Sequence, residues 1–506
     1  MLFVPLLLLQ AVSAETLTCF QSADKSRDRL TQKADITLTP GDPPSNSEGV
    51  TISVNRDERY QSIDGFGGAF TDSTAWLFSQ LSEEKQEEVL ESYFGESGHK
   101  YTLARLQIGS SDFALEHYNY ANSTDDYALD NFTIAHDEAY IIPMIRRAIE
   151  KRTQAADGGS LRFLSTPWSP PAWMKRNNRM QNSLMPGLRQ EEEVQAAWAL
   201  YFSKYISAYK DAGVDVSYVT VQNEPHVAKQ FMVTYECCGF DPTHERDFLR
   251  DHLGPRLRAD HPSVKIYIHD DQKDDRMIDM VDTVMADPAA AQYVDGVAFH
   301  WYDNWGKNYD ILDQVQTAYP TLPLLATEAT LMRPLTQFLP WNHGYWAQGQ
   351  MYAVDIIRDL NHGATGWIDW NMLLDRQGGP SSQSLGPIKD LGNCDAPIRL
   401  NLTGYPFADE ESGDGSLIYG SAYWHFGHFS RFLPVGSVRV EVTAQVASDE
   451  EPKVEFVCFE TPSKELTLIV LNGNDNEETY TFNVPGVGFS EVTMPPQSIQ
   501  TLVLKE

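Results

Sequence analysis

The sequence predicts an α/β fold, a (β/α)8 TIM barrel with an all-β sandwich domain built from both chain termini. Three observations predict it. Between residues 60 and 375, eight short apolar runs alternate with amphipathic helical patterns, which is the strand count of such a barrel. After about residue 424 the pattern changes to strands without intervening helices. The length of 506 residues suits two or three domains.

The barrel is assigned to residues 61–424. An open, doubly wound sheet is the competing arrangement, but it usually has fewer strands, and no G-x-G-x-x-G loop follows a strand in this sequence. The expected strands are 62–70, 102–109, 161–168, 216–224, 264–270, 295–302, 323–329 and 363–371. The expected helices are 74–93, 138–152, 191–212, 244–259, 276–286 and 346–361.

The β domain is assigned to residues 425–506 together with an N-terminal segment, 15–60. Val438, Val440 and Val442 alternate with polar neighbours, as in a strand with one buried face. The stretch TISV at 51–54 precedes the barrel, and we expect it to add a strand to this domain. Further strands are expected at 453–460, 465–472, 480–484 and 498–504.

The chain begins with features of a secreted protein. Residues 1–14 are an apolar run followed by small residues, which predicts a cleaved signal peptide; an apolar N-terminal strand is the alternative. No later segment has the roughly 18 consecutive apolar residues of a membrane helix. Glycosylation sequons begin at Asn122, Asn131 and Asn401. We therefore expect a glycoprotein of the secretory pathway, either lysosomal or extracellular.

Charge and composition exclude several classes of function. The 39 basic and 71 acidic residues give a net charge of −32, which repels phosphate and excludes a general nucleic-acid binder. The five cysteines show neither a CxxC pair nor a Cys/His spacing typical of zinc, so no metal is expected. The 11 Trp, 23 Tyr and 23 Phe residues suit a site that grips flat, amphipathic rings such as sugars.

Two glutamates stand at expected strand ends, where a TIM barrel places its active site. Glu224 ends the fourth strand and Glu328 the seventh. For either residue alone, a surface ion pair or a helix cap explains the carboxylate equally well. Together they would face each other across the barrel mouth, as the two carboxyl groups of glycoside hydrolases do. Aromatic residues are expected on the same rim at Trp168, Trp301, Tyr302 and Trp370.

Six motifs in one order support a family assignment. They are FGGAFTDS at 66–73, STPWSPPAWMK at 165–175, NEP at 223–225, HWY at 300–302, TEA at 327–329 and GWIDWN at 366–371. Over roughly residues 50–505, including FGHFSRF at 426–432, the chain resembles the lysosomal acid glucosylceramidases of glycoside hydrolase family 30. The fold of that family is a (β/α)8 barrel with a β domain from both termini, as expected above.

The resemblance implies a retaining β-glucosidase that splits glucosylceramide into glucose and ceramide through a covalent glucosyl-enzyme, without a cofactor. It implies that Glu224 is the general acid/base, that Glu328 is the nucleophile, and that Arg105 keeps Glu328 ionised. It also implies a saposin-like activator as a partner. The strong acidity of the chain fits work at low pH, where partial protonation of the carboxylates would ease approach to an anionic membrane surface. The substrate-binding residues that the resemblance implies are Arg105, Asp112, Phe113, Trp168, Asn223, Gln272, His300, Tyr302 and Trp370.

The sequence departs from the family pattern around the expected aglycone pocket. Val233 and Tyr235 stand where aromatic pocket residues are usual, GNCD at 392–395 replaces an aromatic-bearing loop, and Thr330 replaces a cysteine. Another family 30 specificity, such as a β-1,6-glucanase or β-xylosidase, therefore stays open, as does an inactive glycan- or lipid-binding barrel. Candidate contacts to a lipid are Phe231, Met232, Val233 and Phe240, which packing explains equally well.

Overall fold

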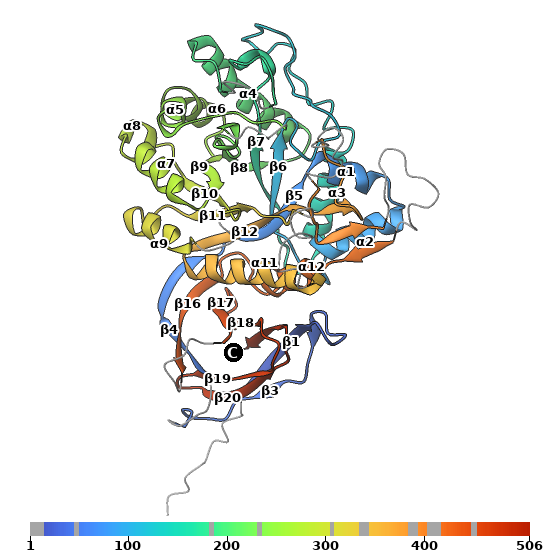
Figure 1. Cartoon of the computed structure of the whole chain (residues 1–506), viewed down its shortest axis with the longest axis vertical. Helices are drawn as coiled ribbons and strands as arrows, with labels where there is room; N and C mark the ends of the chain where they lie inside the picture. Colours follow the sequence, from blue (N-terminus) through green and yellow to red (C-terminus); the bar gives the residue numbers. More distant parts are fainter. Residues whose placement is uncertain are drawn as a thin grey trace, which may run out of the picture. The chain divides into compact units, whose positions relative to one another are not determined.

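The computed structural model describes residues 15–44, 50–181, 187–229, 235–303, 308–332, 344–382, 393–401, 416–446 and 453–505. The chain divides into two compact units, Gln61–Gly436 and a unit of both chain ends, Met1–Tyr60 with Ser437–Glu506 (Figure 1). The expected boundary at residue 424 falls inside helix α12 (Ser421–Ser430), which packs on α11 (Gly344–Asn361) within the first unit. The expected signal peptide lies outside the described residues.

The first unit contains a closed barrel of eight parallel strands, which confirms the predicted α/β class (Figure 1). Seven of the eight expected apolar runs contain one barrel strand each, and β9 extends two residues beyond the run expected at 264–270. Every residue of five of these strands is buried, as expected for a sheet covered on both faces. The strands are β5 (Gly65–Phe70), β6 (Leu103–Ile108), β7 (Arg162–Pro167), β8 (Val216–Thr220), β9 (Lys265–Gln272), β10 (Gly296–His300), β11 (Leu324–Glu328) and β12 (Ala364–Asn371).

One layer of the barrel interior takes a side chain from seven of the strands. It is closed by two tyrosines, Tyr218 and Tyr267, whose rings meet edge to face at 5.6 Å. Close strand packing also explains a glycine in β5, because a Cβ at Gly67 would lie 1.7 Å from the Leu103 carbonyl oxygen. The layer consists of Leu103, Leu164, Tyr218, Tyr267, Ala298, Leu325 and Ile368.

Two of the expected helices are interrupted. The stretch 74–93 forms α1 (Asp72–Ser79) and α2 (Glu83–Phe94), because the side chain of Ser82 accepts the Lys85 N–H and starts a new helix. The stretch 244–259 forms α5 (Pro242–Phe248), a π turn (Leu249–Leu253) and α6 (Gly254–Asp260). Pro255 lacks the N–H that a continuous α-helix needs there. The other helices are α3 (Ile141–Gln154), α4 (Glu192–Asp211), α7 (Asp275–Met285), α8 (Pro288–Ala291) and α9 (Tyr309–Ala318).

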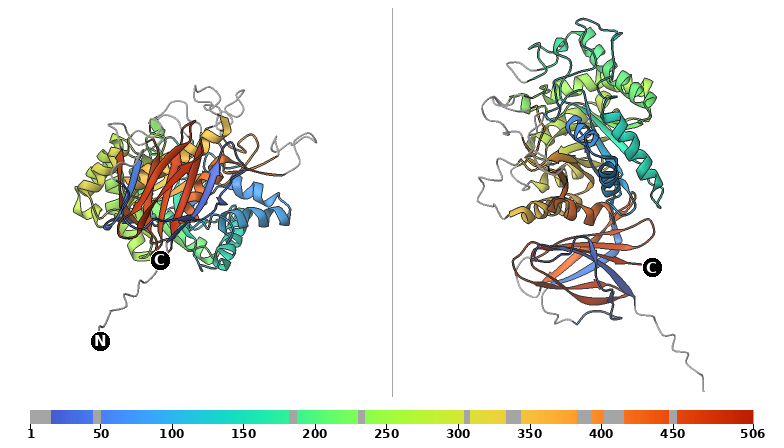
Figure 2. Two further views of the ribbon diagram at one scale, coloured as in Figure 1. Left: turned by 90° about the horizontal axis from the view of Figure 1, so that it is seen from below. Right: turned by 90° about the vertical axis from the view of Figure 1, so that its right-hand side faces the viewer.

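The second unit is the predicted β domain, built from strands of both chain ends (Figure 2). β1 (Thr16–Ala23) pairs with the last strand, and β4 (Val50–Ser62) pairs in parallel with β19. β1 and β20 were not among the expected strands, because their apolar residues are few and interspersed with polar ones. The C-terminal strands are β16 (Val438–Val446), β17 (Glu455–Glu460), β18 (Leu466–Asn472), β19 (Glu478–Val484), β20 (Gly488–Met494) and β21 (Ser498–Leu504).

The remaining strands are short. β2 (Thr31–Gln32) and β3 (Ile36–Thr37) pair with β1, and β13 (Leu373–Asp375), β14 (Ile398–Leu400) and β15 (Leu417–Tyr419) form a separate small sheet. All five cysteines are buried free thiols. Across the described stretches of chain, no helix combines the length and apolarity needed to cross a membrane.

Candidate active site

A cavity of about 470 Å³ opens where the barrel strands end at their carboxyl side. This is the face on which TIM barrels carry their active sites. Both predicted glutamates line it. The complete lining is Asp112, Trp168, Asn223, Glu224, His226, Val227, Tyr235, Gln272, Arg276, Tyr302, Glu328, Thr330, Met332, Trp370 and Cys394.

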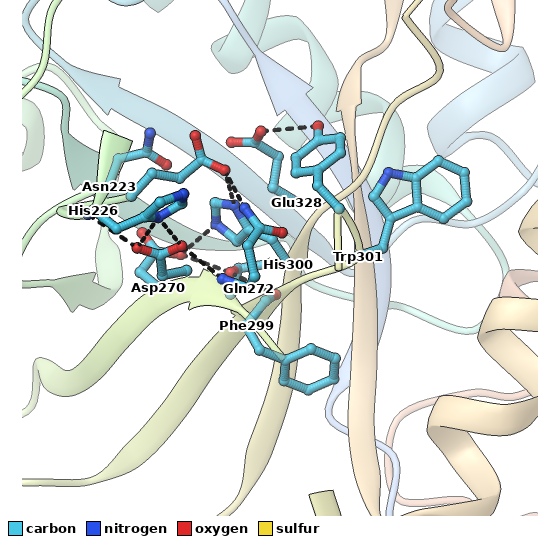
Figure 3. A network of polar contacts seen from close by, with 12 residues as sticks. Asn223, His226, Asp270, Gln272, Phe299, His300, Trp301 and Glu328 are labelled. Atoms are coloured by element: carbon cyan, nitrogen blue, oxygen red, sulfur yellow. Dashed lines mark hydrogen bonds and ion pairs between the residues drawn. The ribbon is translucent and has the colours of Figure 1, made fainter. Parts of the chain in front are cut away.

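Glu224 follows β8 in a left-handed backbone conformation, with φ +40°. Its N–H donates to the carbonyl oxygen of Asp270, also left-handed at φ +49°, over 3.0 Å. Such conformations are costly for residues other than glycine, and they cluster at functional sites. In Glu224 the backbone aims the carboxylate into the cavity, where Oε1 accepts Gln272 Nε2 at 2.6 Å and lies 3.1 Å from His300 Nδ1 (Figure 3).

Glu328 is the last residue of β11, and its carboxylate faces that of Glu224. Its Oε1 accepts the Tyr302 hydroxyl at 3.0 Å, and its Oε2 lies 3.6 Å from Arg105 Nη2. One carboxylate oxygen of Glu224, one of Glu328 and one ring nitrogen of His300 all lie within 4.8 Å of one another. The fold therefore brings together two acids that are 104 positions apart in the sequence, 328 − 224.

A buried network beneath the cavity holds both glutamates in place (Figure 3). Arg105 donates to both carboxylate oxygens of Asp270 at 3.0 Å, and to Asn223 Oδ1 at 2.8 Å. His300 bridges Asp270 and Glu224 with its two ring nitrogens. Hydroxyl groups of two threonines, one at the end of β8 and one in β11, complete the bonds to Asp270. Because its acceptors are satisfied by five donors, Asp270 is a buried anion that the protein can sustain.

The network shifts the pKa values of its members. Burial works against the charged form of Asp270, but the Arg105 charge and the bonds from His300 hold the pKa of this carboxyl far below its usual range. Burial likewise opposes the His300 imidazolium, yet the Glu328 charge and the bonds to Asp270 and Glu224 raise its pKa to about 10. Burial raises the pKa of Glu328, against the opposing charges of His300 and Arg105.

The same charges decide how the site would treat a metal ion. Among the described residues, Glu224, His300 and Glu328 are the one group of side chains placed to ligate a cation together. Metal binding requires a neutral imidazole with an available nitrogen. Here His300 uses both nitrogens on carboxylates, and its raised pKa favours the imidazolium. The arrangement fits proton transfer better than metal ligation.

Two tryptophans form an aromatic wall of the cavity. Trp168 and Trp370 stack with ring centroids 5.0 Å apart at an interplanar angle of 21°. The Arg105 guanidinium lies 5.2 Å from the first ring and 5.8 Å from the second. Phe113 meets Trp370 edge to face at 6.4 Å and is fully buried. The two tryptophan rings give the cavity flat apolar surface beside its carboxylates, as sugar binding requires.

Not every residue expected to bind substrate reaches the cavity. Arg105 and His300 lie behind the glutamates, with no exposed surface, and Phe113 packs behind Trp370. The lining contains six of the expected residues, Asp112, Trp168, Asn223, Gln272, Tyr302 and Trp370. Burial and the nearby charges of Glu328 and Glu224 raise the pKa of Asp112.

Several residues of the site are not among the expected site residues. Asp270 and Asp271 lie in the last part of β9, where strand alternation gives no reason for two successive side chains both to contact the site. His226 and Arg276 also line the cavity, and neither belongs to a motif quoted above. The signal for His226 was its position two residues after Glu224.

Some residues of the loops that depart from the family pattern line the cavity, and others do not. Tyr235, Thr330 and Cys394 line it, and the Cys394 thiol is buried with a pKa raised by that burial. Phe240 packs against His244, with ring centroids 4.4 Å apart, and contributes to the fold rather than to the cavity. Phe231, Met232, Val233 and Gly392 lie outside the described residues.

Family models match both units of the chain. The glycosyl hydrolase family 30 TIM-barrel domain matches residues 63–433, and the family 30 beta sandwich domain matches residues 436–502.

Relatives cover most of the chain. Putative glucosylceramidase 3 of Caenorhabditis elegans is 34% identical over 91% of this chain and 83% of its own length. Lysosomal acid glucosylceramidase of Mus musculus is 31% identical over 90% of this chain and 83% of its own length. Endo-1,6-β-D-glucanase BGN16.3 of Trichoderma harzianum is 26% identical over 88% of this chain and 85% of its own length. Among solved structures, SrfJ from Salmonella typhimurium superposes with a TM-score of 0.82 at 28% identity, over 97% of this chain and 100% of that one.

Proposed function

The chain belongs to glycoside hydrolase family 30, and we propose that it is a retaining β-glucosidase that hydrolyses glucosylceramide to glucose and ceramide. The observation that carries the proposal is the pair Glu224 and Glu328, whose nearest oxygens lie within 4.8 Å at an open cavity. Retaining glycosidases place their two carboxyl groups about 5–5.5 Å apart, whereas inverting enzymes need about 6.5–9.5 Å to admit a water molecule. The short separation favours direct attack by a carboxylate.

In the first step of the proposed reaction, Glu328 attacks the anomeric carbon and Glu224 donates its proton to the glycosidic oxygen. The carbon–oxygen bond to the aglycone breaks, ceramide leaves as an alcohol, and a glucosyl ester of Glu328 remains. In the second step, Glu224 takes a proton from water while the water oxygen attacks the anomeric carbon. The ester bond breaks, glucose is released, and both glutamates return to their starting states.

The buried charges support these protonation states. Arg105 and His300 are the cations of the network, and Asp270 is its fixed anion. Two positive charges and one negative charge are balanced by a single further negative charge. A net charge in a buried site is costly. The proposed mechanism gives that negative charge to one glutamate and the transferable proton to the other. We assign the negative charge to Glu328, because Arg105 lies 3.6 Å from its carboxylate.

The glucosyl residue is assigned to the part of the cavity formed by Trp168, Trp370, Asn223 and Asp112. The tryptophan wall provides flat apolar surface for the sugar ring, and the two polar side chains provide hydrogen-bonding groups for its hydroxyls. The choice of ceramide as leaving group rests on the glucosylceramidases of worm and mouse among the relatives. A β-1,6-glucanase is the second candidate, since a fungal endo-1,6-β-D-glucanase is also related over most of the chain.

Activity of two matched variants tests the mechanism. We expect Glu328→Gln to abolish hydrolysis of every β-glucoside, because the attacking oxygen is lost. We expect Glu224→Gln to lower kcat/KM by about 100- to 10,000-fold on glucosylceramide, and far less on aryl glucosides with acidic leaving groups that need no proton. Equal losses on all substrates would contradict the assigned roles. Trapping with a fluorinated glucose analogue, followed by mass spectrometry, should label Glu328.

The proposal extends to the compartment and the partners of the protein. The signal peptide expected at 1–14 and the lysosomal relative support a lysosomal or secreted enzyme. Two of the three sequons are compatible with glycan attachment, since Asn122 and Asn131 are exposed, and Asn401 is half-buried. Endoglycosidase treatment of protein made in a secretory host, with mass measured before and after, tests this. Dependence of glucosylceramide hydrolysis on anionic vesicles or a saposin-like activator tests the membrane partners.

A further inference from the structure

The cavity wall beyond Glu224 is polar and carries a guanidinium. Arg276, in the first turn of α7, and His226, two residues after Glu224, both line the cavity together with Gln272. The reaction at the anomeric carbon explains the position of Gln272, which binds Glu224. It does not explain why Arg276 and His226 line the cavity. The position of Arg276 and His226 must therefore be explained by something else that enters the cavity, or by structure alone.

The imidazole of His226 is hydrogen-bonded to the buried carboxylate of Asp271. Its Nδ1 lies 2.6 Å from Asp271 Oδ2, and its own N–H donates to the same oxygen at 3.3 Å. Asp271 also accepts the N–H of Gln272 at 2.7 Å, and only 3% of its side chain is exposed. The imidazole itself keeps 18% of its side-chain surface exposed. Asp271 thus fixes the ring of His226 on the cavity wall in one orientation.

The guanidinium of Arg276 is bound by one aspartate, which leaves some of its N–H groups without a partner among the described residues. Its Nε donates to Asp274 Oδ1 at 2.9 Å and its Nη2 to Asp274 Oδ2 at 2.5 Å. A guanidinium has five N–H groups, and 43% of the Arg276 side chain is exposed. Among the described residues, Asp274 is its one hydrogen-bonding partner. The remaining N–H groups therefore belong to the surface of a cavity that contains the proposed general acid.

The chemistry of the proposed reaction says what these groups meet. Glu224 delivers its proton to the glycosidic oxygen, so the leaving group lies on the Glu224 side of the cavity. A polar wall there favours an aglycone with oxygen atoms near the scissile bond. A purely apolar leaving group would cover the N–H groups of Arg276 that Asp274 does not bind without offering them an acceptor, which is costly.

We propose that Arg276 and His226 form a polar aglycone subsite that selects β-glucosides whose leaving group carries hydroxyl or amide oxygens close to the glycosidic bond. This inference rests on the proposed glucosidase activity and names the leaving-group chemistry of the same site. Two sources offer that chemistry: the amide and hydroxyl of ceramide, and the hydroxyls of a second sugar. Hydrogen bonds to a charged donor make the subsite selective for either over an aromatic leaving group.

The test measures kcat/KM for wild type, Arg276→Leu and His226→Ser on three substrates. These are glucosylceramide in detergent micelles, a β-1,6-linked glucose disaccharide, and 4-nitrophenyl β-glucoside. We expect Arg276→Leu to lose about 10-fold or more on a polar aglycone relative to its loss on the nitrophenyl glucoside, as for a hydrogen bond to a charged group. We expect His226→Ser to show the same direction. A loss confined to glucosylceramide identifies ceramide as the source, and one confined to the disaccharide identifies a sugar.

Matched controls separate a subsite from a general effect on the protein. Arg250→Leu removes an arginine that is held by its neighbour Asp251 and is absent from the cavity lining. His362→Ser removes a histidine bound to Asp313 at 2.8 Å on the surface. Both variants should keep the wild-type kcat/KM on all three substrates. Equal losses of Arg276→Leu on all substrates, or wild-type cleavage of the nitrophenyl glucoside alone, would overturn the subsite. Failure of wild type on every β-glucoside would instead overturn the proposed function.

Discussion

Two buried charge clusters begin at neighbouring residues of the chain and have opposite characters. Gln272, the last residue of β9, binds Glu224 in the site network. Lys273, the next residue, has a fully buried side chain that binds Asp355 and Asp359 of α11 at 2.8 Å and 2.7 Å. Because these two successive side chains point in different directions, Gln272 belongs to the active-site network and Lys273 to a second cluster. We call this second cluster the outer cluster and define it as Lys273, Asp303, Asp355 and Asp359.

The two clusters differ in charge balance and in access. The site network sets two cations against three carboxyls, and its two glutamates line an open cavity. The outer cluster sets one cation against three carboxyls, and none of its members lines that cavity. Both oxygens of Asp303 are buried with no hydrogen-bonding partner among the described residues. The first cluster can exchange a proton with a ligand, whereas the second can only take up protons to relieve its own excess charge.

The largest effect should come from removing the fixed anion of the site network. Asp270→Asn leaves Arg105 and His300 as two buried cations without their common partner. We expect kcat/KM on an aryl glucoside to fall by about 100- to 1,000-fold, since the charges aimed at the reacting centre are changed. We also expect the pH profile to move, because His300 loses an anion that raises its pKa.

A second buried aspartate provides the control. Asp137 is fully buried and accepts hydrogen bonds from Tyr120 and Tyr209, and it does not line the cavity. Asp137→Asn should lower stability with little loss of kcat/KM. If folded Asp270→Asn retained the wild-type rate and pH profile, the network would not set the protonation of the glutamates, and the comparison between the clusters would fail.

The next effect should be on stability rather than on activity. Lys273→Met leaves the three carboxyls of the outer cluster without their cation. Removing one partner of a buried ion pair typically costs about 3–5 kcal/mol of unfolding free energy. We expect that loss in urea unfolding at pH 7.5, a smaller loss at pH 5, where carboxyl groups take up protons, and a far smaller effect on kcat/KM than that of Asp270→Asn. A loss of activity as large as that of Asp270→Asn would show that the outer cluster belongs to the site.

The sequence predicted the barrel and the two glutamates for physical reasons that hold locally. Buried parallel strands are short apolar runs, and Glu224 and Glu328 are carboxylates at the ends of such runs. The position of the two acids across one mouth needed only the barrel closure. The family resemblance added roles that no local pattern contains.

The rest of the network could not be predicted because β9 departs from regular alternation. His269 and Asp270 both have positive φ, and the register with β10 shifts beside them. Strict alternation would place Asp270 and Gln272 on one face and Asp271 on the other. Instead, three successive side chains bind Arg105, His226 and Glu224 in turn. The interruptions of the helices are equally local events, set by Ser82 and Pro255.

The smallest and most specific effect concerns Asp303 and pH. Burial raises the pKa of Asp303 to about 7, with the Lys273 charge opposing the shift and the charges of Asp355 and Asp274 reinforcing it. An unfolded aspartate titrates near pH 4. The folded state therefore binds an extra proton between about pH 4 and 7, and unfolding free energy falls as pH rises through that range. Asp303→Asn removes this dependence.

We therefore expect the thermal midpoint of Asp303→Asn to exceed that of wild type by roughly 3 °C or more at pH 8 and to match it at pH 4. Asp282→Asn is the control, since this exposed aspartate accepts the Tyr319 hydroxyl on the surface and should show no such difference between the two pH values. A variant that was less stable than wild type at pH 8 would mean that the Asp303 carboxylate is needed as an anion by Lys273. The outer cluster would then be a balanced ion-pair network like the site, and the excess of negative charge that distinguishes the two clusters would not exist in the folded protein.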